Sequence, residues 1–144
     1  MNSLQSVTVH QGVGLEGDRY ALGVGAYSKI EPIKVRHATL ITEESIAIAN
    51  AWFAEQGEPP MTALLTRRNL LIDQISAAAL NALVGREFTL GGARFRGLEL
   101  ADPCQRPTRL LGRTGFEKAF DGRGGLRAEA LAGGILTLGD KLVC

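Results

Sequence analysis

Cys104 is the residue whose sequence context points most directly to chemistry. It lies between Pro103 and Pro107, with Arg106 and Arg109 close by. Each proline fixes its own φ and disfavours helix for the residue before it, so we expect a stiff, irregular segment. Neighbouring guanidinium groups favour the thiolate, which is the form that attacks electrophiles, carries sulfur or ligates a soft metal. A buried, inert cysteine is the alternative, and the local residues do not decide between the two.

Arginines elsewhere in the chain supply candidate anion ligands. Arg67, Arg68 and Asn69 come directly before an apolar stretch of strand length, and Arg19 follows a glycine-rich segment. Guanidinium groups bind phosphate in a bidentate way, and an asparagine amide both donates to and accepts from the edge of a heterocycle. If these residues lie beside Cys104, they predict a site for an anionic ligand with a thiolate at its reacting end. The alternative is that they are solvated surface charges.

The glycine-rich segment itself matches the letters of a dinucleotide-binding fingerprint at residues 12–17 (GVGLEG). That fingerprint requires its last glycine to open a helix whose N-terminus binds the pyrophosphate. Here two further glycines, Gly23 and Gly25, stand where the helix would run. We therefore reject a nicotinamide site and keep only the weaker expectation that backbone amides of this segment approach an anion.

Composition restricts the classes of protein that the chain can belong to. With 144 residues, 16 basic and 15 acidic side chains and a net charge of +1, we expect one domain over residues 1–144 and no binding to nucleic acid or to an anionic membrane. Two cysteines do not make a disulfide framework, although a Cys104–Cys144 bridge stays open. The first residues lack a signal-peptide pattern and no apolar run is long enough to span a bilayer, so we expect a cytoplasmic protein without a membrane segment.

Short elements separated by glycines are predicted along most of the chain. Alternating apolar residues favour a strand at residues 6–10, and a weaker pattern favours a strand at 35–41. Residues 70–72 read as a short apolar strand. Thr42 offers a helix cap, and apolar residues at helical spacing follow it until Gly57. A second helix is expected from about residue 76 to residue 84, ending at Gly85.

The second half of the chain reads as β-structure. Residues 86–100 predict a hairpin that turns at Gly91 and Gly92, with a bulge at Gly97 where the apolar phase shifts by one residue. Segments 126–131, 135–138 and 142–143 read as further strands. In the first of these, helical propensity between residues 127 and 132 competes with the strand interpretation.

The order of these motifs resembles a known family. The segments GLEGDRY at 14–20, RRNL at 67–70, LVG at 83–85 before the glycine hairpin, PCQR at 103–106, GLRA at 125–128 and the glycines from 133 to 140 together resemble a MOSC domain, the C-terminal domain of molybdenum cofactor sulfurases. The resemblance implies a mostly β fold, a MOSC or pyruvate-kinase-barrel-like β-barrel with two or three short peripheral α-helices. It also implies a cysteine that ligates molybdenum in reductase members.

Carried over by position, the resemblance assigns roles to particular residues. Cys104 matches the metal-ligating cysteine, and Arg68 and Asn69 match the basic and amide positions near the molybdenum cofactor (molybdopterin). The complete set of expected cofactor-binding residues is Arg19, Arg67, Arg68, Asn69, Arg106 and Arg127. The chain departs from the family in having Tyr20 where a histidine is frequent, and in its short N-terminal part. The barrel wall is therefore expected to be either incomplete or completed by a partner, such as a second copy of the chain.

Two classes of function follow from the resemblance. In the first, Cys104 ligates molybdenum for the reduction of N-hydroxylated compounds, or carries a persulfide that delivers sulfur to a metal cofactor, with a redox or sulfur-donor protein as partner. In the second, the chain is a non-catalytic binding or carrier module, or a structural barrel with an inert cysteine. A fold by itself does not choose between these classes.

Overall fold

The fold is mostly β with short peripheral helices, which confirms the expected fold class. The structure, a computed structural model, describes residues 5–18, 37–62, 64–101 and 115–144. Its strands are β1 (Ser6–His10), β2 (Gly14–Leu15), β3 (Ala38–Thr42), β4 (Leu70–Ile72), β5 (Glu87–Leu90), β6 (Ala93–Leu100), β7 (Leu126–Ala132), β8 (Gly134–Thr137) and β9 (Leu142–Val143). Its helices are α1 (Glu43–Glu55), the 3-10 turn η1 (Leu64–Thr66), α2 (Ala77–Asn81) and α4 (Phe116–Ala119).

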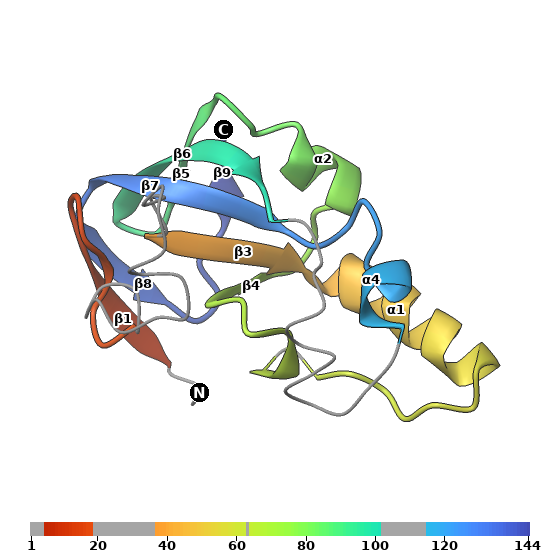
Figure 1. Cartoon of the computed structure of the whole chain (residues 1–144). Coiled ribbons are helices and arrows are strands. Elements are labelled where there is room, and N and C mark those ends of the chain that lie inside the picture. The colour runs from red at the N-terminus through yellow and green to blue at the C-terminus, as the bar shows by residue number, and fades with distance from the viewer. Residues whose placement is uncertain (1–4, 19–36, 63, 102–114) are drawn as a thin grey trace, which may run out of the picture.

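Six strands form a nearly closed, barrel-like sheet in the order β4-β3-β7-β6-β5-β9 (Figure 1). Strands β3 and β4 are parallel, and the other neighbours are antiparallel. Parallel neighbours need a crossover connection, and helix α1 lies in the connection between β3 and β4. A smaller sheet, in the order β2-β1-β8, completes the described strands. Strand β7 pairs with both β3 and β6, so it is central to the larger sheet.

The barrel core is formed by the inward side chains of the strands and of α2. Phe88 and Phe95 are paired across the β5–β6 hairpin, and their rings stack with centroids 5.6 Å apart. Leu80 and Leu83 add apolar surface from α2 and the turn after it, and both are buried. The rest of this cluster comes from the strands, in which every second residue points into the core. The alternation of apolar and polar residues predicted from the sequence therefore matches the packing of the core.

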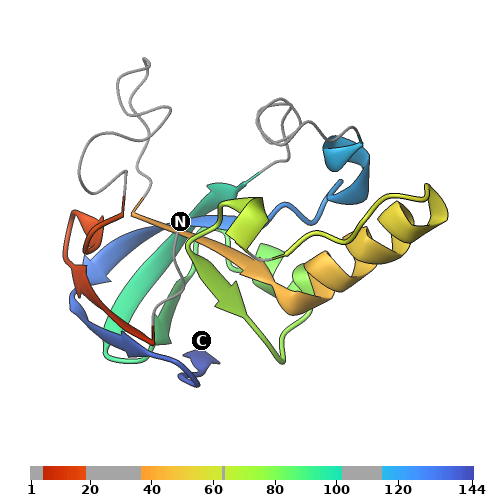
Figure 2. The same cartoon turned by 90° about the horizontal axis from the view of Figure 1, so that it is seen from below.

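A second apolar cluster lies outside the barrel, between α1 and α4 (Figure 2). Phe53 of α1 and Phe120, which follows α4, are fully buried in it, together with Met61. Trp52 meets Phe53 edge to face, with ring centroids 5.4 Å apart. The sequence predicts α1 but gives no signal for α4, because four residues are too few to show a helical period.

Both predicted helix starts are confirmed, and one predicted end is wrong. Thr42 Oγ1 accepts a hydrogen bond from the Ser45 amide at 3.0 Å, as expected for the N-cap of α1. Ser76 caps α2 in the same way. Helix α2 stops at Asn81 rather than near residue 84, because the chain then turns and Val84 forms a bridge with Gly97.

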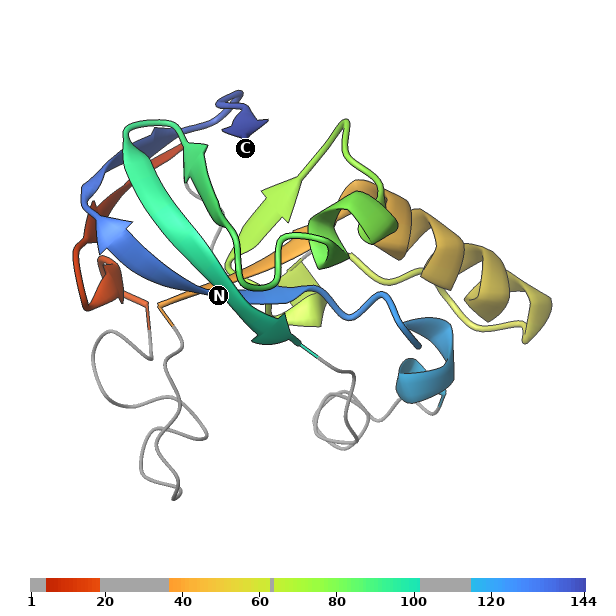
Figure 3. The same cartoon turned by 90° about the horizontal axis from the view of Figure 1, so that it is seen from above.

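The hairpin and its bulge are confirmed. The turn at Gly91 and Gly92 joins β5 to β6 (Figure 3), and the register of β6 against β7 shifts between Gly97 and Glu99. A second shift lies between Arg94 and Phe95, which the apolar pattern does not indicate. A Cβ at residue 97 would lie 2.1 Å from the carbonyl oxygen of Leu83. The glycine is therefore required by a close approach of the chain that follows α2.

Residues 126–132 form a strand despite their helical propensity. Leu126, Ala128 and Ala130 point into the core and are buried, while the residues between them are partly exposed. Pairing with strands on both sides satisfies the backbone of β7 and outweighs the local preference of its alanines.

The glycine-rich segment after β1 forms a turn, the two-residue strand β2 and a second turn, and no helix begins by Asp18. Gly17 has φ of +81° in that second turn rather than at the start of a helix. This geometry agrees with the rejection of a dinucleotide fingerprint for the part of the segment that is described. No described helix has both the length and the apolar character needed to cross a bilayer.

Candidate functional site

Four of the seven residues that the sequence assigns to the site lie within the described chain. Arg67, Arg68 and Asn69 lie between η1 and β4, and Arg127 is the second residue of β7. The other three, Cys104, Arg19 and Arg106, lie outside the described residues. The geometry of the candidate site is therefore built from the first four and from the residues that contact them.

Asn69 is fixed by hydrogen bonds to Thr39 of β3. Its Oδ1 accepts a hydrogen bond from the Thr39 backbone amide at 2.7 Å and lies 3.3 Å from Thr39 Oγ1. The backbone amide of Asn69 donates to Thr39 Oγ1 at 3.0 Å. Its Nδ2 donates to Asp18 Oδ1 at 3.3 Å. These bonds place the start of β4, the start of β3 and the end of the glycine-rich turn at one place. The side chain of Asn69 is thus held in a single orientation.

Arg127 of β7 lies opposite Thr39, which is its partner across the β3–β7 ladder. Asn69, Thr39 and Arg127 therefore follow one another in a row across the sheet. On its other side Arg127 pairs with Glu99 of β6, whose carboxylate contacts Arg127 Nη2. Only 12% of the Arg127 side chain is exposed, and its Nε is buried without a hydrogen-bond partner. A buried donor left without a partner costs free energy, so it marks a place where an acceptor would be stabilising.

The guanidinium group of Arg68 reaches the place where β6 ends and β7 begins. Its Nε donates to the carbonyl oxygen of Gly124 at 2.8 Å, and its Nη2 donates to that of Ala101 at 3.3 Å. The Ala101 amide in turn donates to the Gly125 carbonyl at 2.8 Å. The guanidinium thus joins two backbone segments just beyond the last register pair of the β6–β7 ladder.

Arg67 has φ of +60°, a left-handed value that is uncommon for a residue other than glycine. Residues held in such backbone conformations cluster at functional sites. The surrounding structure must offset the conformational free energy that they cost. Here the conformation turns the chain between η1 and β4, and so determines the positions of Arg68 and Asn69. This observation supports a functional assignment for the RRN segment.

His37 also lies in this part of the molecule, although the sequence does not single it out. It precedes β3, and its Nδ1 accepts a hydrogen bond from the Ala130 amide of β7 at 2.9 Å. Burial lowers the pKa of His37, and the carboxylate of Glu129 opposes that shift. The side chain therefore continues the hydrogen bonding of β7 beyond the first residue of β3, with a neutral imidazole.

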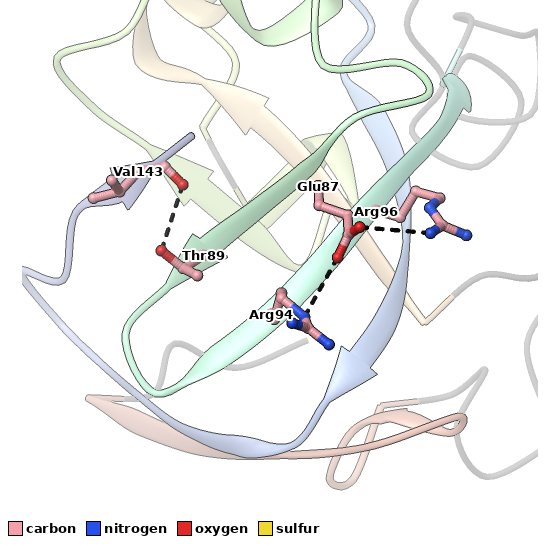
Figure 4. Close-up of polar contacts among 5 residues, drawn as sticks. All are labelled: Glu87, Thr89, Arg94, Arg96 and Val143. Atoms are coloured by element: carbon pink, nitrogen blue, oxygen red, sulfur yellow. Dashed lines mark hydrogen bonds and ion pairs between the residues drawn. The ribbon is translucent and has the colours of Figure 1, made fainter.

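A separate group of charges lies on the outer face of the β5–β6 hairpin (Figure 4). Glu87 lies between Arg94 and Arg96, with nitrogen–oxygen distances of 3.5 Å and 3.7 Å. About half of each of these side chains is exposed, so solvent screens the pairs. We read this group as surface charge and not as part of the candidate site.

Chemically, the described site offers a fixed amide, a buried guanidinium nitrogen and a cationic group at a chain junction. These groups suit an anionic or heterocyclic ligand. Among the described residues, no three His, Cys, Asp or Glu side chains are grouped to bind a metal ion. Cys144 is an exposed free cysteine at the end of the chain.

Sequence reasoning missed the partners of these residues, namely Thr39, Asp18 and Glu99, and it also missed the contact of His37 with β7. Thr39 and Glu99 are the polar residues of an alternating pattern, which shows that they point outward but not which strand lies beside them. Only the strand order brings them into one row. A signal for His37 does exist, because it is a titratable residue at the start of a predicted strand, but its partner is remote in the sequence.

Solved structures show the same fold. YuaD from Bacillus subtilis matches with a TM-score of 0.75 and 16% identity, over 96% of this chain and 84% of that one. YiiM from Escherichia coli matches with a TM-score of 0.70 and 18% identity, over 96% of this chain and 61% of that one. YiiM from Geobacillus stearothermophilus gives 0.62 and 19%, over 75% and 53%. At these identities the likeness is one of fold, and the chain spans about three fifths or less of the YiiM proteins.

The sequence gives the family directly. No curated protein matches the chain. Residues 29–143, however, match the MOSC domain family, and the matched range includes the RRN segment, the Cys104 segment and all of β7. With this match and with the fold that it shares with YuaD and YiiM, the chain belongs to the MOSC domain family.

Proposed function

We propose that the chain binds the molybdenum cofactor, with the Cys104 thiolate as metal ligand. Family membership supports this proposal, because MOSC domains are associated with that cofactor. The observation that carries it on this chain is the buried, unpartnered Nε of Arg127. Arg127 pairs with Thr39 across the β3–β7 ladder, and Thr39 is in turn hydrogen-bonded to Asn69. An anionic group of the cofactor would supply the acceptor that this donor lacks.

The described residues fit the cofactor in part. Arg127 and Asn69 present groups that would hold its phosphate or its pterin, and Arg67 and Arg68 add positive charge beside them. In this proposal Arg19 and Arg106 complete the anion-binding set, and Cys104 ligates the metal. A thiolate suits a thiophilic metal, and fixed guanidinium groups neutralise a phosphate with little reorganisation.

When bound, the cofactor would supply two-electron redox chemistry. The reaction class that we propose is reduction of an N-hydroxylated compound, in which two electrons and two protons break the N–O bond and release an amine and water. A redox protein would supply the electrons. In the sulfur-carrier version, Cys104 would hold a persulfide whose outer sulfur passes to a metal cofactor as sulfide, with two electrons supplied by a redox protein and release of the Cys104 thiolate. A sulfur-donor protein would then reload that thiolate from a persulfide of its own.

A second candidate is a non-catalytic binding or structural barrel with an inert cysteine. It is favoured by the bonds that the described cationic groups already make within the protein. Arg68 donates to two backbone carbonyls, and Arg127 pairs with Glu99. Arginines used in this way stabilise the fold without any ligand, so the two candidates must be separated by measurement.

The test is to express the chain in a host that makes the cofactor, and to measure molybdenum and pterin per protein. Wild type and Cys144→Ser, a matched change at the exposed cysteine, are expected to carry both in near-stoichiometric amounts. Cys104→Ser is expected to carry less molybdenum per pterin, because one ligand of the metal is removed. Arg127→Met is expected to lose pterin and metal together, while its circular dichroism stays that of the wild type. A folded wild type with neither molybdenum nor pterin would exclude the proposal and favour the second candidate.

A further inference from the structure

Besides its proposed role in binding the cofactor, Arg68 contacts the backbone of its own chain at two places. It donates from Nε to the Gly124 carbonyl at 2.8 Å and from Nη2 to the Ala101 carbonyl at 3.3 Å. With the bond from the Ala101 amide to Gly125, at 2.8 Å, three hydrogen bonds join the end of β6 to the chain before β7. Without Arg68, two of the three would be lost.

Ala101 is the last described residue before the segment that contains Cys104, and it precedes that cysteine by three positions. Fixing its carbonyl fixes the direction in which the chain leaves β6. We propose that Arg68 is a positioning residue, which sets the reactivity of Cys104 by holding the backbone at Ala101 and Gly124. This inference rests on the proposed function, because it assumes that Cys104 is the reacting group.

The geometry favours positioning over a simple effect of charge. A guanidinium presents its nitrogens in a rigid plane, so one side chain can reach two carbonyls of separate segments in a fixed relation. A lysine keeps the charge but is a flexible point donor, and it does not impose that relation. The two explanations therefore differ in what they predict for Arg68→Lys.

The opposite side of the same segment is held by packing. Gly115 is the first described residue after it. Its backbone packs against the indole ring of Trp52 of α1, and a Cβ on Gly115 would lie 2.5 Å from that ring. The Ala119 amide of α4 donates to the Gly115 carbonyl at 2.9 Å. The described ends of the Cys104 segment are thus held independently, one by a guanidinium and one by an aromatic ring.

The experiment uses Cys144→Ser as its background, so that Cys104 is the one remaining thiol of the chain. In this background we compare Arg68 with Arg68→Lys and Arg68→Met. Arg123→Lys is the matched control, because Arg123 Nη2 also donates to a backbone carbonyl, that of Ala119, at 2.6 Å. Two readouts are taken, namely amide hydrogen exchange and the pH profile of alkylation by iodoacetamide.

Hydrogen exchange tests the backbone step. In both Arg68 variants, the Ala101 amide is expected to exchange faster by about tenfold, the size of losing a hydrogen bond from a charged group. The Gly97 amide of β6, which donates to the Arg86 carbonyl at 2.9 Å, is expected to keep its exchange rate. Unchanged exchange at Ala101 overturns the inference, and so does an equal acceleration at both amides, because Arg68 would then only stabilise the whole fold.

Alkylation tests the step from backbone to thiol. We expect both Arg68 variants to move the profile of Cys104 towards that of an ordinary thiol, near pH 8.5. A profile that moves for Arg68→Met but not for Arg68→Lys would overturn positioning, because the charge alone would then suffice. No movement in either variant would also overturn it, and Arg123→Lys is expected to leave the profile in place.

These readouts require no cofactor, so the inference and the proposed function fail separately. Absence of molybdenum from the wild type would exclude the proposed function and leave the exchange and alkylation results unaffected. Conversely, a molybdenum-loaded wild type whose Ala101 exchange is insensitive to Arg68 would exclude positioning by Arg68 alone.

Discussion

Strand β7 is supported by a charged donor at its start and by a neutral acceptor near its end. Before Leu126, the guanidinium of Arg68 donates to the Gly124 carbonyl, whereas at Ala130 the imidazole of His37 accepts from a backbone amide. We name these places the arginine junction (Arg68, Ala101, Gly124 and Gly125) and the histidine junction (His37, Gly14 and Ala130). In each, a side chain replaces a strand partner that the ladder lacks.

The difference between the junctions is a difference in response to pH. A guanidinium stays charged at all ordinary pH values, so the arginine junction has the same bonds throughout. The imidazole must be neutral to accept from Ala130, and protonation of Nδ1 would place a donor against a donor. The comparison shows that one strand can be fixed rigidly beside the proposed Cys104 site and conditionally at its other end.

The largest effects are expected from closing the space at each junction. A Cβ on Gly125 would lie 2.1 Å from the Leu40 carbonyl oxygen, and one on Gly14 would lie 2.6 Å from that of His37. Both glycines have positive φ, +109° and +123°. We expect Gly125→Ala to lower the free energy of unfolding in urea by about 3 kcal/mol, and Gly14→Ala by somewhat less.

Gly17→Ala is the control for these two substitutions. It also has positive φ, +81°, but a Cβ there would meet no atom within 4 Å. Its expected cost is about 1 kcal/mol, from the backbone conformation alone. Equal losses for all three variants would show that backbone conformation, and not the close approach at the junctions, determines the cost.

A medium effect is expected from His37→Leu, and it should depend on pH. Removing the acceptor leaves the Ala130 amide without its hydrogen bond. This loss is expected to lower the free energy of unfolding by about 1 kcal/mol at pH 7.5. The folded-state pKa of His37 lies below the ordinary 6.5, so the unfolded chain takes up the proton first. The contribution of His37 is thus complete above pH 6.5 and is lost as the pH falls through the lowered pKa.

Urea unfolding of wild type and His37→Leu from pH 7.5 to pH 5 measures this directly. The difference between the two proteins should shrink as the pH falls. For Arg68→Met, the same comparison should give a constant difference over this range, because the guanidinium does not titrate. A His37→Leu difference that stays constant would contradict the distinction between the junctions.

The smallest effect is expected away from both junctions, at Glu87. Its pairs with Arg94 and Arg96 are 3.5 Å and 3.7 Å long and about half exposed. Glu87→Gln should therefore change the free energy of unfolding by no more than about 0.5 kcal/mol, and less in high salt. A loss as large as that of His37→Leu would mean that exposed charge on the hairpin stabilises β6 as much as the junctions stabilise β7.

Local chemistry in the sequence predicted much of this fold. Thr42, Gly91 and Gly97 were predicted from the pattern of the residues beside them, as a cap, a turn and a bulge, and all three are confirmed. The junctions were beyond such reasoning, because Arg68 contacts residues 33 and 56 positions away and His37 contacts one 93 positions away. Family resemblance assigned Arg68 to a cofactor, but only the strand order shows the carbonyls that it also holds.

The candidate site was predictable as a set of residue types and not as an arrangement. Asn69 and Arg127 were chosen from the sequence, whereas Thr39, which connects them, has no chemistry that would single it out. The unpartnered Nε of Arg127 is likewise a property of packing and has no sequence signal. Side chains become a site through the register of β3 against β7, which the sequence leaves open.

The central claim is that Cys104 is a ligand of molybdenum, and X-ray absorption at the molybdenum edge tests it most directly. Wild type and Cys104→Ser are each loaded with the cofactor, and the sulfur atoms bound to the metal are counted. We predict one sulfur ligand fewer in Cys104→Ser, with Cys144→Ser identical to wild type. An equal count of sulfur ligands in wild type and Cys104→Ser would contradict the claim.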